Sequence, residues 1–223
     1  MTEQSTLSPS RRVVSAPARA VHAILAISFG VAYLTGDSDF WQTVHVTMGY
    51  TVLAAIALRV LWGVVGPRSE QTKVWVNRTQ SAWSWASALF TRPRLQDMTP
   101  DKLAQHAVSL SIAALVSLLI IAAATGWLMG LEWSNGWVDD GLSEVHEFMA
   151  NGAIAAVCLH LGAVLILAGS RGSGWVMRMW HGRIQGKGPD LVKHNSLLIA
   201  LTITLATLGF WVASLTGWVQ VVG

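Results

Sequence analysis

Five long apolar stretches, separated by polar connections, dominate the sequence. They lie at about residues 18–35, 43–65, 103–131, 143–168 and 195–219, and few charges interrupt them. Each is close to the roughly 20 residues that cross the hydrocarbon core of a bilayer as an α-helix. The pattern therefore predicts an all-α membrane protein with five transmembrane helices.

The composition supports this class and excludes others. The chain is 52% hydrophobic and 12% charged, whereas soluble proteins carry roughly 25% charged residues. A disordered chain would need low hydrophobicity. Cys158 is the single cysteine, so no disulfide can form within the chain, and we interpret it as an apolar filler of the fourth helix.

The basic residues predict the orientation, because Lys and Arg stay on the cytoplasmic side of a membrane. They fall before the first helix and in the second and fourth connections: Arg11, Arg12, Arg19, Arg68, Lys73, Arg78, Arg92, Arg94, Lys102, Arg171, Arg178, Arg183, Lys187 and Lys193. The connections at 36–42 and 132–142 lack Lys and Arg but contain acidic residues: Asp37, Asp39, Glu132, Asp139 and Asp140. We therefore expect a cytoplasmic N-terminus, and the net charge of +3 indicates topology rather than nucleic-acid binding.

Two further segments complete the expected organisation. Residues 1–17 form a polar cytoplasmic tail that runs into a first helix without a small-residue cleavage site, so we expect that helix to be retained as an anchor. Residues 18–223 form a single transmembrane domain. In the second connection, aromatic and aliphatic residues alternate with basic ones, as in a helix that lies flat in the membrane interface. They are Trp75, Trp83, Trp85, Leu89 and Phe90 with Lys73, Arg78 and Arg92.

Four histidines lie inside the predicted spans, where an ionisable side chain is costly and usually faces the bundle interior or a cofactor. His22 is near the cytoplasmic end of the first helix and His45 near the opposite end of the second. His146 and His160 are fourteen residues apart on the fourth helix, which is nearly four turns and about 21 Å. They share one face, with His146 level with His45 and His160 close to the level of His22. The spacing thus predicts two histidine pairs at different depths.

Two facing imidazoles at one depth are what bis-histidine ligation of a porphyrin requires. The two pairs predict two haems, and the absence of a C-x-x-C-H motif indicates non-covalent b-type haem. Taken singly, each histidine could merely hydrogen-bond a neighbouring helix. Four histidines could also line a zinc pathway, although transport sites usually add intramembrane carboxylates and cluster near the midplane.

Arg59 is a charge inside the second helix. It lies fourteen residues after His45, so it shares that helix face and is expected near the level of the inner haem. Its guanidinium has two candidate environments. One is a haem propionate, which it could bind through two hydrogen bonds, and the other is the cytoplasmic surface, which a long side chain can reach.

Several segments resemble a known family. They are Ala18-Arg19-Ala20-Val21-His22, Leu34-Thr35-Gly36, His45-Val46-Thr47-Met48-Gly49-Tyr50, Arg59-Val60-Leu61-Trp62-Gly63, Gly66-Pro67-Arg68, Val145-His146-Glu147, Leu159-His160, and Met179 with Gly182 and Arg183. The chain resembles the prokaryotic di-haem cytochrome b561 family, which includes the b-type cytochrome subunits of nickel-iron hydrogenase and thiosulfate reductase.

The resemblance implies a four-helix haem-binding bundle with a fifth transmembrane helix beside it. It implies that His22 and His160 ligate the inner haem and that His45 and His146 ligate the outer one. The expected function is transmembrane electron transfer between a quinone or quinol pool and a periplasmic or membrane partner, such as a c-type cytochrome or a hydrogenase. It leaves open whether the chain is a quinol/quinone oxidoreductase or a subunit of one. The expected location is the bacterial inner membrane, as part of a respiratory chain.

An alternative class is a non-redox membrane transporter, or an anchor subunit whose histidines are structural. Two other histidines begin helices near the cytoplasmic interface, His106 in Gln105-His106-Ala107-Val108 and His194 after Lys193. Each is either a quinone-headgroup ligand or a solvated residue at a helix start. His181 has no partner at a matching depth, so we assign it no site.

Overall fold

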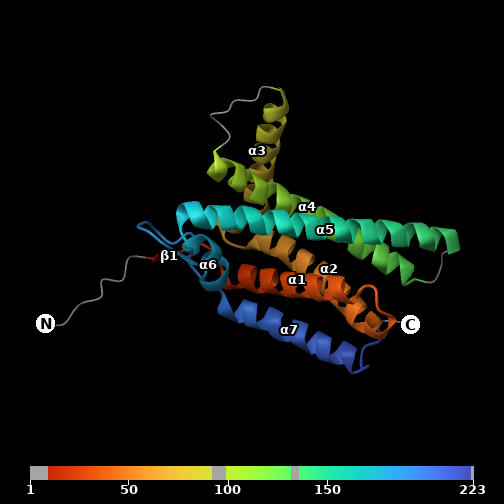
Figure 1. Ribbon diagram of the computed structural model, residues 1–223. Helices are drawn as coiled ribbons and strands as arrows, with labels where there is room; N and C mark the ends of the chain where they lie inside the picture. Colours follow the sequence, from red (N-terminus) through yellow and green to blue (C-terminus); the bar gives the residue numbers. More distant parts are fainter. Residues whose placement is uncertain (1–9, 92–98, 132–135, 222–223) are drawn as a thin grey trace.

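The computed structural model describes residues 10–91, 99–131 and 136–221, and helices dominate it (Figure 1). Five of the described helices are long and apolar enough to span a membrane. These are α1 (Ala16–Thr35), α2 (Gln42–Val65), α4 (Pro100–Met129), α5 (Gly136–Arg171) and α7 (Leu197–Leu215). The prediction of an all-α multi-pass membrane protein with five spans is therefore confirmed.

Three helices differ in length from the prediction. Helix α5 begins at Gly136, so the described part of the acidic connection is helical, and acidic side chains such as Asp139 suit a helix N-terminus. At 36 residues it is about 54 Å long, well beyond the roughly 30 Å core of a bilayer. Helix α4 begins earlier because Thr99 caps it, accepting from the Lys102 N–H at 3.4 Å. Helix α7 ends at Leu215, shortly before the left-handed turn at Gly217 (φ 79°).

The remaining described elements lie mainly outside the five spans, and all except the 20-residue α3 are short. They are β1 (Ser10–Arg12), η1 (Asp39–Trp41), η2 (Arg68–Glu70), α3 (Thr72–Thr91), α6 (Gly174–His181) and β2 (Arg183–Gln185). Strands β1 and β2 pair antiparallel, with Arg11 opposite Ile184. The described part of the polar tail, residues 10–17, forms strand β1 and the start of α1. Residues 1–9 of that tail, and Glu132, Arg92 and Arg94, lie outside the described residues.

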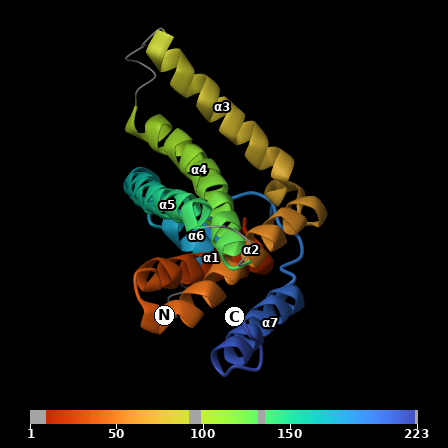
Figure 2. The ribbon, with the colours of Figure 1, turned by 90° about the vertical axis from the view of Figure 1, so that its right-hand side faces the viewer.

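The spanning helices form two hairpins, α1 with α2 and α4 with α5, which lie side by side (Figure 2). The hairpins share an apolar cluster, the midplane core: Phe29, Val52, Ile56, Leu119 and Ala153. Helix α7 packs against α1 and α2 on the side away from α4 and α5. Trp211 on α7 donates its indole N–H to Thr51 Oγ1 of α2 at 2.9 Å, which fixes the fifth span to the bundle.

Helix α3 leaves the bundle rather than joining it. In Figure 1 its axis runs across the long axis of the spanning helices. It contacts the start of α4, where Trp85 stacks on His106 with ring centroids 4.6 Å apart. A helix at this angle lies in the plane of a membrane that the other helices cross, which is the geometry that its alternating aromatic and basic residues favour.

One end of the bundle, which we call the basic end, holds β1, β2, α6 and η2. Here the buried Glu70 carboxylate accepts from the Ser15 N–H (2.6 Å), the Ser15 hydroxyl (2.7 Å) and the Trp62 indole (2.7 Å). Gly182 ends α6 with φ 73°, and its carbonyl accepts the N–H groups of Val13 and Val14. A Cβ at Gly182 would lie 2.6 Å from the Val14 carbonyl oxygen, so only glycine allows this approach.

Candidate haem-binding site

The first pair of predicted ligands faces each other across the two hairpins. His45 near the start of α2 and His146 on α5 have ring centroids 5.8 Å apart. Two imidazoles that share one metal, each at a metal–nitrogen distance of about 2 Å, have centroids roughly 6 Å apart. We call His45 and His146 the outer tier. Its spacing is close to what two imidazoles would need to share a single iron.

Hydrogen bonds fix which nitrogen of each outer histidine is available. His45 Nδ1 lies 2.8 Å from the Ala32 carbonyl oxygen, and His146 Nδ1 lies 2.8 Å from the Ala122 carbonyl oxygen. A carbonyl only accepts, so each Nδ1 carries the proton and donates it. Each Nε2 then has the free lone pair that a metal requires. The donor set of the outer tier therefore fits a haem iron.

Two glycines lie against these rings. A Cβ at Gly36 would lie 3.5 Å from Cε1 of His45, and a Cβ at Gly126 only 3.1 Å from Cε1 of His146. Gly126 on α4 therefore leaves the space that the His146 ring occupies. This role was not predicted from the sequence, because nothing in the residues around Gly126 shows which side chain of a neighbouring helix lies against it.

The second pair, His22 and His160, forms the inner tier near the basic end. His160 Nδ1 lies 3.2 Å from Ser111 Oγ, and Ser111 donates its one hydroxyl proton to the Val108 carbonyl at 3.0 Å. Ser111 therefore accepts from His160 Nδ1, which again leaves Nε2 free. His22 is exposed on α1 and near enough to His160 for the two side chains to interact electrostatically. Ser111 is a second residue that sequence reasoning missed.

The midplane core separates the tiers. Phe29 lies seven residues after His22, Val52 seven after His45, and Ala153 midway between His146 and His160. Seven residues are about two turns of helix, or about 10 Å. The bundle thus contains two levels of imidazole with an apolar layer between them.

Arg59 has a partner that the sequence did not indicate. Both terminal nitrogens of its guanidinium lie 3.3 Å from the backbone carbonyl oxygen of Glu70. This contact turns the side chain toward η2 and the basic end. Whether Arg59 also binds a propionate stays a prediction.

The other histidines lie apart from the two tiers. His106 stacks on Trp85 at the foot of α3, and His181 and His194 are exposed at the basic end. Within residues 10–91, 99–131 and 136–221, no three His, Cys, Asp or Glu side chains come together as a metal site would require. The tiers are pairs, as axial ligation of haem requires.

A membrane bundle with facing histidine pairs is the arrangement expected of a membrane-embedded b-type cytochrome. The family model of prokaryotic cytochrome b561 matches residues 13–182, which takes in both tiers and ends before α7. The chain belongs to the prokaryotic cytochrome b561 family, and with it come b-type haem binding and electron transfer in the membrane. No curated protein and no solved structure matches the chain.

Proposed function

We propose that this protein carries electrons across the membrane through two b-type haems. His22 and His160 hold the inner haem, and His45 and His146 hold the outer one. The observation that carries the proposal is the outer tier, where two imidazoles 5.8 Å apart both donate Nδ1–H to main-chain carbonyls. The inner tier repeats the arrangement at His160 with a serine hydroxyl as acceptor.

The protein supplies position and surroundings for this chemistry. Haem, when bound, supplies the one-electron redox couple. The histidines would hold it as neutral imidazoles. At His45, His146 and His160 the hydrogen bond at Nδ1 sets the orientation of the ring and the basicity of the other nitrogen. Phe29, Leu119 and the rest of the midplane core keep water out of the layer between the tiers. Arg59 remains a candidate partner for a propionate.

The charge distribution supports an orientation and a class of partner. With the basic end in the cytoplasm of a bacterial inner membrane, the acidic end faces the periplasm, where Asp37, Asp39 and Asp140 are exposed. Such a surface suits a basic redox partner such as a c-type cytochrome, and a membrane-bound hydrogenase is a second partner of the same kind. We propose the quinone or quinol pool as the other partner, with His106 and His194 as candidate headgroup ligands.

Optical spectroscopy with haem quantification tests the proposal. Purified protein should show the reduced-minus-oxidised bands of low-spin b-type haem, with about two haems per chain. His106→Ala serves as a matched control, since it removes a helix-borne histidine outside both tiers and should retain both haems. A ratio of one haem per chain would refute the two-tier scheme, and folded but colourless protein would refute the function.

A further inference from the structure

An arginine at the basic end lies beside the inner tier. Arg178 belongs to α6, the short helix that follows α5 (Figure 1). Its guanidinium carbon lies 3.8 Å from the centroid of the Trp175 ring. Trp175 packs against the apolar cluster of Ala104, Ala163 and Leu167, in which Ala163 is less than one turn beyond His160. Trp175 therefore holds Arg178 near the inner tier, close enough for its charge to act on His160.

The surroundings of Arg178 are positively charged. Arg171 places its guanidinium carbon 4.9 Å from the same Trp175 ring, and Arg78 of α3 is near enough to interact electrostatically. Burial, and then the charges of Arg78 and Arg171, lower the pKa of Arg178 to about 10. The guanidinium is still protonated at neutral pH. A largely buried cation among like charges is costly unless an anion joins it.

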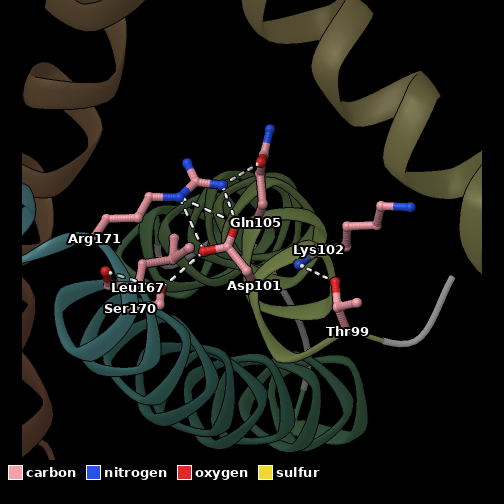
Figure 3. Close-up of polar contacts among 7 residues, drawn as sticks. All are labelled: Thr99, Asp101, Lys102, Gln105, Leu167, Ser170 and Arg171. Carbon is pink, nitrogen blue, oxygen red and sulfur yellow. Dashed lines mark hydrogen bonds and ion pairs between the residues drawn. The ribbon is translucent and has the colours of Figure 1, made fainter. Parts of the chain in front are cut away.

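Arg171 already has such an anion. Its Nε lies 2.9 and 3.1 Å from the two carboxylate oxygens of Asp101, its terminal nitrogen contacts the same carboxylate, and Gln105 accepts at 3.0 Å (Figure 3). The Arg178 guanidinium, by contrast, makes no hydrogen bond or ion pair with any residue that the structure describes; it stacks on Trp175. The unused capacity to bind an anion therefore lies with Arg178.

We propose that Arg178 binds a propionate carboxylate of the inner haem. This inference rests on the proposed function, because it requires a haem between His22 and His160. The propionates are the anions that a b-type haem would bring to this level. A guanidinium binds a carboxylate through two parallel hydrogen bonds, and stacking on Trp175 holds its plane in place beforehand. Arg59 is turned toward η2 by its contacts with the Glu70 carbonyl oxygen and stays a separate candidate, since it keeps further N–H donors.

Redox titration of Arg178→Gln tests the assignment. Loss of a cation beside the inner haem disfavours its reduced form. At a fixed potential, the ratio of oxidised to reduced inner haem should rise about tenfold, which for one electron is a fall of about 59 mV in midpoint potential. The outer haem should keep its potential. Lys187→Gln, which removes one positive charge from an exposed position, is the matched control and should shift neither haem.

A phospholipid phosphate has the same anionic chemistry, so a second arm separates the two sources. The full-length chain, stripped of haem, is reconstituted with natural haem or with haem whose two propionates are methyl esters. The native chain should hold the ester about tenfold more weakly at the inner site, whereas Arg178→Gln should bind both forms alike. If the variant instead loses bound phosphate per chain and discriminates as the native chain does, the occupant is a lipid and the assignment is wrong.

Arg178→Lys covers the case in which the Gln variant does not accumulate. It keeps the charge but not the planar pair of donors, so the inner potential should fall in the same direction by less. If the midpoint potential of the inner haem is unchanged in a Lys or Gln variant that retains two haems, the role of Arg178 is refuted and the proposed function is not. A native chain with fewer than two haems refutes the proposed function instead, so the two failures are distinguishable.

Discussion

Both tiers consist of two imidazole side chains, but they differ in how firmly hydrogen bonds fix the orientation of the rings. In the outer tier both rings are fixed by main-chain carbonyls, from Ala32 and Ala122. In the inner tier His160 depends on the Ser111 side chain, and His22 has no hydrogen-bond partner among the described residues. A main-chain acceptor is present whenever the helix is formed, whereas a side-chain acceptor adds its own rotamer freedom. The described contacts therefore hold the rings of the outer tier more firmly than those of the inner tier.

Removal of one ligand from either tier should have the largest effect. His146→Ala should abolish the outer haem and leave the inner one, because the pair it forms with His45 is then incomplete. His160→Ala should do the reverse. Haem per chain should fall from about two to about one in each case, measured by haem extraction and difference spectra. Loss of both haems from His146→Ala would show that the tiers are not independent.

The pairing itself can be checked with the same measurement. His45→Ala should remove the same spectral component as His146→Ala, and His22→Ala the same component as His160→Ala. Redox titration of each variant identifies which component remains. If His45→Ala and His160→Ala removed the same component, the assignment of partners would be wrong.

Filling the space beside His146 should disturb the outer tier almost as much. In Gly126→Val, the added side chain begins 3.1 Å from Cε1 of His146 and must displace the ring from its contact with Ala122. We expect outer-haem affinity to fall by about 100-fold, the upper range for changes that misorient a metal ligand. Gly209→Val is the control, since a Cβ there meets nothing within 4 Å.

Haem titration of the stripped protein measures that affinity. The inner haem of Gly126→Val should bind as in the native chain. Equal weakening of both haems would mean that the valine loosens the whole bundle rather than the His146 ring.

The tiers also show how much of this molecule the sequence predicts. The five spans follow from hydropathy. The four histidines stand out because an ionisable side chain inside a membrane costs free energy. The shared face of His146 and His160 follows from helical rise alone. These properties are local to a single helix, so they need no knowledge of how helices pack.

Residues on α4 could not be assigned in this way. Ser111 and Gly126 contact the histidines because they lie on the face of α4 that is turned toward α5. The sequence does not show which face this is, because α4 is apolar on nearly every side. Ser111 therefore looks no different from Ser109 or Ser117. Arg59 likewise has the depth that spacing predicts, but its acceptor is set by the path of the connection at Glu70. Strands β1 and β2 pair residues that are more than 170 positions apart, which no local pattern encodes.

Removing the inner-tier acceptor should have a moderate effect. Ser111→Ala leaves His160 Nδ1 without its oxygen, so the ring loses orientation and basicity, and inner-haem affinity should fall about tenfold. Ser109→Ala on the same helix is the matched control, because Ser109 donates to Gln105 and touches neither tier. Haem titration of both variants measures the difference. An unchanged inner haem in Ser111→Ala would mean that the hydroxyl does not orient His160.

The smallest effect should come from Thr125, which offers the outer tier a side-chain acceptor of the kind that Ser111 provides. Its Oγ1 lies 3.4 Å from His146 Nδ1, but the Ala122 carbonyl is closer at 2.8 Å and takes the proton. Thr125→Val preserves shape and should therefore change outer-haem affinity by less than about twofold, a few tenths of a kcal/mol. A tenfold loss, measured as for Ser111→Ala, would show that the carbonyl does not suffice and that the two tiers depend on side chains equally.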